Sequence, residues 1–194
     1  DKHKNNKHIL VGISMGANSF SNYLCQTNDK RVTTLISIYN PLDLLTICYS
    51  QTYSIINNYL VNRFFKKNMK KYLLLNFAKS KTVKDNINMY LNNLDLFYSK
   101  FIKPYNKKKY KTFNEYTYNN SCINFIDNLE IPSLFIFADD DCVTPISKSQ
   151  IEKLKNNKNI LQLHSRYGSH VGHYDDEGNV WLVNLIDQYI KFII

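Results

Sequence analysis

The sequence predicts an α/β fold with a parallel sheet, because short apolar runs alternate with segments of helical periodicity. Two further features support a fold of this class. A serine stands between two glycines directly after one apolar run, and a histidine stands between two glycines after another. The chain of 194 residues has only five glycines, and four of them flank just these two residues, which makes their placement informative.

The first apolar run, "HILVGI" at 8–13, is short and rich in β-branched residues, which predicts a strand. The next segment, 15–26, predicts a helix with Phe20, Tyr23 and Leu24 on one face.

Between strand and helix, Gly12, Ser14 and Gly16 form a Gly-x-Ser-x-Gly pattern. A sharp strand-to-helix turn strains the serine backbone, and we expect its neighbours two positions away to lack side chains that would clash. Ser14 is therefore a candidate nucleophile, and the alternative is a tight turn with a passive serine.

A second buried strand is predicted at 32–40 and ends before Pro41. From 42 to about 129 the apolar residues recur at spacings of three and four, interrupted by lysine and asparagine. This pattern predicts a helical insertion whose basic runs are solvated faces and loops.

Strand character returns at 131–139, followed by a helix at 147–157, a strand at 159–164 and an amphipathic helix at 179–193. In a parallel sheet, catalytic groups lie on loops at the carboxyl ends of strands. The loops after the last two predicted strands are "ADDDCVTP" and "SRYGSHVGHYDD", and they contain acids and histidines.

Both the acid and the histidine have more than one candidate. Three consecutive aspartates, Asp139 to Asp141, are candidates for the acid. His170 lies between Gly168 and Gly172, whereas the rivals His173 and His164 do not, and His164 at a strand end suits a structural role.

The order serine, aspartate, histidine distinguishes this chain from the two best-known serine protease folds. "VGISMGANSFSNYL", "LISIYNPLDL", "IPSLFIFADDDCVTP" and "GSHVGH" resemble the α/β-hydrolase superfamily, and within it the abhydrolase-domain esterases and lipases that act on acylglycerols and phospholipids. The resemblance runs from residue 8 to the end and is weakest over 42–110. This chain has Ala17 and Ser169 where those families usually have glycine.

The resemblance implies a catalytic triad. Ser14 would be the nucleophile, His170 the general base, and the backbone N–H of Met15 one donor of the oxyanion hole. In the resembled superfamily the catalytic acid usually lies three residues after a small residue and four before a proline. Here Ala138 and Pro145 select Asp141 as the acid, with Asp140 as the alternative and Asp139 as a loop cap.

The resembled fold has eight strands, with the nucleophile after the fifth. Residues 1–194 would then be a partial domain, the C-terminal half of an α/β-hydrolase fold, with a helical cap inserted at about 42–129. Four strands and the loop with the second oxyanion donor would precede residue 1. The expected function is hydrolysis of carboxylic esters, and the alternative is an inactive hydrolase-fold fragment that serves as a binding or scaffold module.

The composition indicates which kinds of partner and cofactor to expect. The net charge of +9 suggests nucleic acid, but lysine is abundant together with asparagine and isoleucine, and only three arginines are present, so we expect no nucleic-acid partner. The four cysteines form no Cys-x-x-Cys pair, which favours a reducing compartment and predicts neither metal nor cofactor. Without a run of 18 apolar residues, membrane association would depend on a segment that precedes residue 1.

Overall fold

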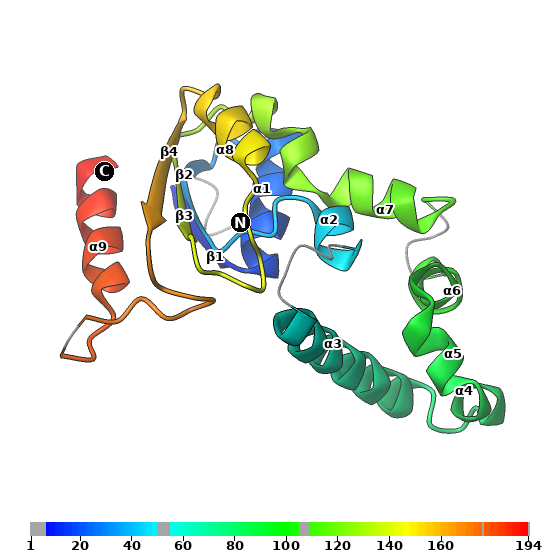
Figure 1. The fold of residues 1–194 in the computed structure, drawn as a ribbon. Coiled ribbons are helices and arrows are strands. Elements are labelled where there is room, and N and C mark those ends of the chain that lie inside the picture. The colour runs from blue at the N-terminus through cyan, green and yellow to red at the C-terminus, as the bar shows by residue number, and fades with distance from the viewer. Residues whose placement is uncertain (1–6, 50–54, 105–108, 176, 194) are drawn as a thin grey trace. The chain divides into compact units, whose positions relative to one another are not determined.

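A computed structural model of the chain describes residues 7–49, 55–104, 109–175 and 177–193 (Figure 1). It divides into two compact units, one of residues 1–48 and 118–194 and one of residues 49–117.

The first unit contains a parallel sheet of four strands in the order β1-β2-β3-β4. The strands are β1 (His8–Ile13), β2 (Val32–Ile38), β3 (Ser133–Ala138) and β4 (Ile160–Ser165). Each matches a predicted strand to within about two residues. The α/β fold class is thus confirmed, and the strands' parallel direction brings their carboxyl ends to one edge of the sheet.

Helices cover both faces of this sheet (Figure 1). On one face, α1 (Met15–Thr27) and α8 (Lys148–Lys155) pack Leu24 and Leu154 against a core that includes Phe135 and Phe137. Phe20 and Tyr23 do not share the buried face of α1, contrary to the prediction. That face consists of Ala17, Asn18, Ser21, Leu24 and Cys25.

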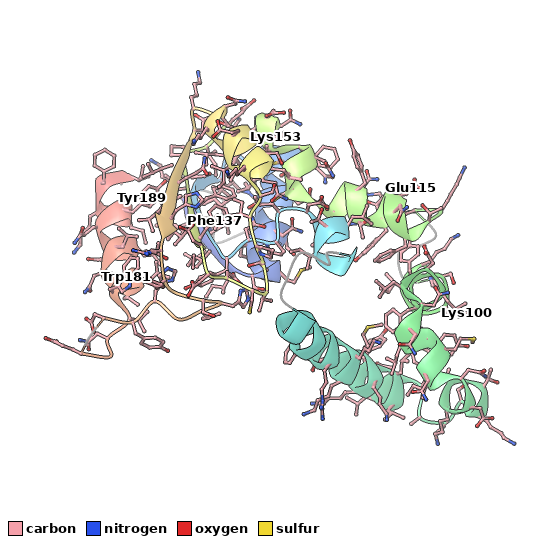
Figure 2. All side chains as sticks on the ribbon, in the orientation of Figure 1. Lys100, Glu115, Phe137, Lys153, Trp181 and Tyr189 are labelled. Carbon is pink, nitrogen blue, oxygen red and sulfur yellow. The ribbon has the colours of Figure 1, made fainter. Side chains whose placement is uncertain are left out.

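On the opposite face, α9 (Trp181–Ile193) packs against Ile36 and Ile136. Figure 2 shows Trp181 and Tyr189 on the side of α9 that faces the sheet. The three layers bury alternate residues of β2 and β3 on opposite faces, which explains why these central strands are almost continuously apolar.

The residues between β2 and β3 that the structure describes are helical or irregular and form no strand. They form α2 (Leu44–Tyr49), α3 (Ile55–Asn76), α4 (Lys81–Asp85), α5 (Ile87–Asn92), α6 (Leu94–Phe97), the π-helix η1 (Tyr98–Ile102), α7 (Phe113–Asn120), and the 3₁₀ turns η2 (Cys122–Asn124) and η3 (Ile126–Asn128). The second unit has its own core, which includes Leu73, Phe97 and Phe101.

Candidate active site

Ser14 lies at the junction of β1 and α1 with a strained backbone. Its φ of 54° and ψ of −125° are unusual for a residue other than glycine, and its N–H donates to the carbonyl of Ile38 at 2.8 Å. A Cβ on Gly12 would lie 2.6 Å from the Cα of Ala17 and 2.7 Å from the carbonyl oxygen of Gly16. Gly12 is therefore required for α1 to begin this close to β1.

Gly16 behaves differently from the expectation that both glycines avoid a clash. Apart from the adjacent residues and the backbone of its own helix, a Cβ at Gly16 would meet no atom of the described residues within 4 Å. The expectation is wrong here because Gly16 lies in the exposed first turn of α1, whereas Gly12 faces that turn from the strand.

His170 is in contact with both other predicted members of the triad. Its Nε2 lies 3.1 Å from the Oγ of Ser14, and its Nδ1 lies 2.9 Å from the Oδ2 of Asp141. The three side chains come from loops that follow β1, β4 and β3. The parallel direction of the strands brings these loops together, although Ser14 and His170 are 156 residues apart.

The carboxylate of Asp141 is buried, with 4% of the residue exposed, and it has hydrogen-bond partners on both oxygens. Its Oδ1 accepts from the backbone N–H groups of Val143 and Thr144 at 2.7 and 3.0 Å, and its Oδ2 accepts from the Thr144 hydroxyl at 2.6 Å. Burial raises the pKa of Asp141, but the hydrogen bonds from His170 and Thr144 outweigh it and hold the pKa below its usual value. Asp141 is therefore ionised at neutral pH.

The competing acids occupy other positions. Asp140 accepts a hydrogen bond from the backbone N–H of Ser169 at 2.7 Å, and Asp139 lies 3.7 Å from the Nδ1 of His164. The structure thus brings Asp141 to the Nδ1 of His170 and uses Asp140 to hold the loop that carries this histidine.

Met15 is the first residue of α1, so its N–H has no carbonyl four residues earlier within the helix. The first turn of a helix also carries the positive end of the helix dipole. The backbone N–H of Met15 can therefore donate to an anion that forms next to Ser14, and its role in an oxyanion hole stays a prediction.

No family model matches the chain. Monoacylglycerol lipase of Saccharomyces cerevisiae is 26% identical over 205 residues, which cover 96% of this chain and 43% of that protein. Phospholipase ABHD3 of Mus musculus is 23% identical over 173 residues, which cover 84% of this chain and 40% of that protein.

Among solved structures, acylaminoacyl peptidase of Pyrococcus horikoshii superposes with a TM-score of 0.53 at 16% identity, over 97% of this chain and 24% of that one. The chain has an α/β-hydrolase fold. It spans less than half the length of the curated relatives it matches, as expected for part of that fold. Its relatives are lipases and esterases of the α/β-hydrolase superfamily.

Three residues beside the predicted triad were not assigned a place in the site by the sequence analysis. Thr144 bonds to Asp141, and the ring of Tyr39 lies 5.4 Å from that of His170. His173, considered only as a rival base, is buried beside Tyr39. A hydroxyl three residues after an aspartate was the available signal for Thr144, but no local pattern marks Tyr39, which follows β2.

The described residues contain no group of three or more histidine, cysteine, aspartate or glutamate side chains placed to hold a metal ion. Within the same described ranges, every helix is too short or too polar to cross a membrane.

Proposed function

We propose that this protein is a serine hydrolase that cleaves carboxylic esters and that its substrates are lipid esters, such as acylglycerols or phospholipids. The observation that carries the proposal is the line of contacts from Ser14 through His170 to Asp141, at 3.1 and 2.9 Å. The substrate class is supported by the names of two relatives, a monoacylglycerol lipase and a phospholipase.

In the proposed mechanism, the Oγ of Ser14 attacks the ester carbonyl while the Nε2 of His170 takes its proton. Asp141 accepts a hydrogen bond from Nδ1–H, so it selects the imidazole tautomer and stabilises the imidazolium. The N–H of Met15 donates to the oxyanion of the tetrahedral intermediate. The intermediate collapses to an acyl-serine as His170 returns the proton to the leaving alcohol, and a water molecule activated by the same histidine then releases the acid.

Several parts of the proposed site stay predictions. The resemblance implies a second oxyanion donor on a segment before residue 1, and membrane association through such a segment. The predicted cap at about 42–129 contains the compact unit of residues 49–117, which fits an insertion between two strands of the sheet. A cofactor or a nucleic-acid partner has no part in this mechanism.

The first test uses the full-length protein and a fluorophosphonate probe, which forms a covalent bond with an activated serine. We expect the wild-type protein to be labelled and Ser14→Ala to lose all labelling. Ser19→Ala is the matched control, because Ser19 lies on α1, five residues after Ser14, and its hydroxyl donates to the carbonyl of Met15. This variant should label normally. Labelling of Ser14→Ala would exclude Ser14, and an unlabelled wild-type protein would favour the binding-module alternative.

The second test compares two aspartates of one loop. Asp141→Asn should lower kcat by about 10⁴-fold because the amide favours the wrong tautomer of His170. Asp140→Asn keeps an oxygen that can accept from Ser169 and should change kcat less than about 10-fold. The reverse order of effects would make Asp140 the acid. Hydrolysis rates for monoacylglycerols, phospholipids and short-chain esters would then define the substrate.

A further inference from the structure

The loop that carries His170 has a strained backbone on both sides of this residue. Ser169 has a φ of 48° and Val171 a φ of 76°, and positive φ is costly for a β-branched residue. The N–H of Gly172 closes the loop by donating to the carbonyl of Gly168 at 2.6 Å. A strained loop keeps one conformation only where its surroundings hold it, so the contacts at its two ends decide where His170 lies.

At the carboxyl end of the loop, the holding group is His173. Its residue is 2% exposed, and both ring nitrogens have partners: Nδ1 contacts the hydroxyl of Tyr39, and Nε2 lies 2.6 Å from the Oγ of Ser165. The ring also packs edge-on against Trp181, with centroids 4.8 Å apart. A Cβ on Gly168 would lie 2.7 Å from Nε2, which gives a reason for glycine at that position.

With a neutral imidazole, the two contacts of His173 and the contact from Ser165 to Phe137 are all hydrogen bonds in only one arrangement of protons. The Ser165 hydroxyl donates to the backbone carbonyl of Phe137 at 3.3 Å, because a carbonyl can only accept, and it accepts from Nε2–H of His173. The Nδ1 of His173 then carries no proton and accepts from Tyr39. Burial raises the pKa of Tyr39 to about 12 and lowers that of His173, so a neutral imidazole and a protonated phenol are the forms present at neutral pH.

Tyr39 connects this chain of bonds to the proposed triad. Its ring lies 5.2 Å from that of His173 and 5.4 Å from that of His170, measured between centroids. Its backbone carbonyl lies 3.1 Å from the hydroxyl of Thr144, which also contacts Asp141. One residue at the end of β2 is thus in contact with the loops of both the acid and the base.

We propose that His173 is a positioning residue for His170, held as one neutral tautomer by Tyr39 and Ser165. The inference rests on the proposed function, in which His170 is the base. A phenylalanine would fill much of the same space, but it would leave the buried hydroxyl of Tyr39 and the half-buried hydroxyl of Ser165 without this partner. The loop would relax, and displacement of a catalytic group by about 1 Å can cost on the order of 10²-fold in rate.

The kinetic test uses the full-length protein. His173→Phe should lower kcat on the order of 10²-fold with KM changed less than about two-fold, because the base moves while the binding surface stays. His173→Gln, which retains one donor and one acceptor, should recover most of the loss. His164→Gln is the control and should leave kcat unchanged.

A double variant separates positioning from folding. Tyr39→Phe combined with His173→Phe removes both partners of the buried bond, so its thermal stability should exceed that of His173→Phe alone. Its kcat should stay low. Recovery of kcat in the double variant, or a normal kcat in His173→Phe, would overturn the proposal.

Nitrogen-15 NMR of the histidine rings provides a readout independent of activity. The wild-type His173 should show a protonated Nε2 and an unprotonated Nδ1, and His173→Phe should shift the resonances of the His170 ring. A different tautomer of His173, or unmoved His170 resonances, would refute the positioning role even if the protein has no esterase activity. If the probe fails to label the wild-type protein but these resonances behave as expected, the proposed function fails and the positioning stands.

Discussion

The two compact units differ in charge. In residues 49–117 there are 14 lysines and arginines and 3 acids, whereas the remaining residues contain 11 and 13. The net positive charge of the chain therefore comes from the second unit. The first unit pairs opposite charges, as between Lys30 and Glu130 at 2.7 Å.

One asparagine of each unit shows a second difference. In the first unit Asn157 is buried and donates to the carbonyls of Ile126 and Leu129, about 30 residues away. In the second unit Asn68 is exposed and donates to Phe64 in the preceding turn of its own helix. Bonds between distant segments define tertiary structure, whereas bonds within a helical turn can be lost without moving another element. Asn157 thus joins distant segments of the first unit, whereas Asn68 bonds only within its own helix.

The largest effect is expected for a variant that tests whether the two units unfold independently. Phe101 is buried between Phe77 and Tyr90, with ring centroids 4.9 Å apart in each case, so Phe101→Ala should cost about 3–5 kcal/mol. Hydrogen exchange should show lost protection in residues 49–117 and unchanged protection in the sheet. Leu75→Ala, at a position 71% exposed, should do neither. Equal loss of protection in both units would show that they unfold together.

A smaller effect is expected for Asn157→Ala, which removes one of two donors to each of two carbonyls. The Asn159 amide still donates to Leu129, and the backbone N–H of Leu129 still donates to Ile126. The loss of two hydrogen bonds should lower the free energy of unfolding of the first unit by roughly 1–3 kcal/mol. Urea unfolding followed by the fluorescence of Trp181 would measure this change. A loss below about 0.5 kcal/mol would mean that water replaces the amide.

Acidification should destabilise the first unit in two steps. Burial lowers the pKa of His173, so the unfolded chain binds a proton first and stability falls as the pH drops below about 6.5. The pKa of Asp141 is also lowered, so its contribution is present above about 3.9 and is lost as the pH falls further. Urea unfolding at a series of pH values should show both steps, and His173→Phe should lack the first. A first step that persists in this variant would assign it to another group.

The smallest expected effect has the opposite sign. Asn68→Ala replaces a poor helix former on an exposed face of α3 and should stabilise the second unit by about 0.5 kcal/mol. Hydrogen exchange within α3 would detect it. Destabilisation by 1 kcal/mol or more would show that Asn68 takes part in tertiary structure.

The sequence predicted the fold most reliably where periodicity and buried strands coincide. The ends of β3 and β4 and the positions of α1 and α9 follow from apolar patterns that the layers then bury. The buried face of α1 was predicted less well, because Asn18 and Ser21 occupy it and bond within the core. Hydrophobic patterns do not reveal a polar residue whose burial depends on a distant partner.

By itself, the sequence determined the order of strands and helices and pointed to Ser14 and His170, because glycine is scarce in this chain and flanks both residues. The resemblance favoured Asp141 and left Asp140 as the alternative, and the tertiary structure separates the contacts of the two. Only the tertiary structure revealed Tyr39 and Thr144 and the buried position of His173. Asp141 contacts His170, whereas Asp140 accepts from the backbone N–H of Ser169. The carbonyl of Tyr39, at the end of β2, contacts Thr144 in the loop of the two aspartates. These contacts form only when the parallel strands align their carboxyl ends.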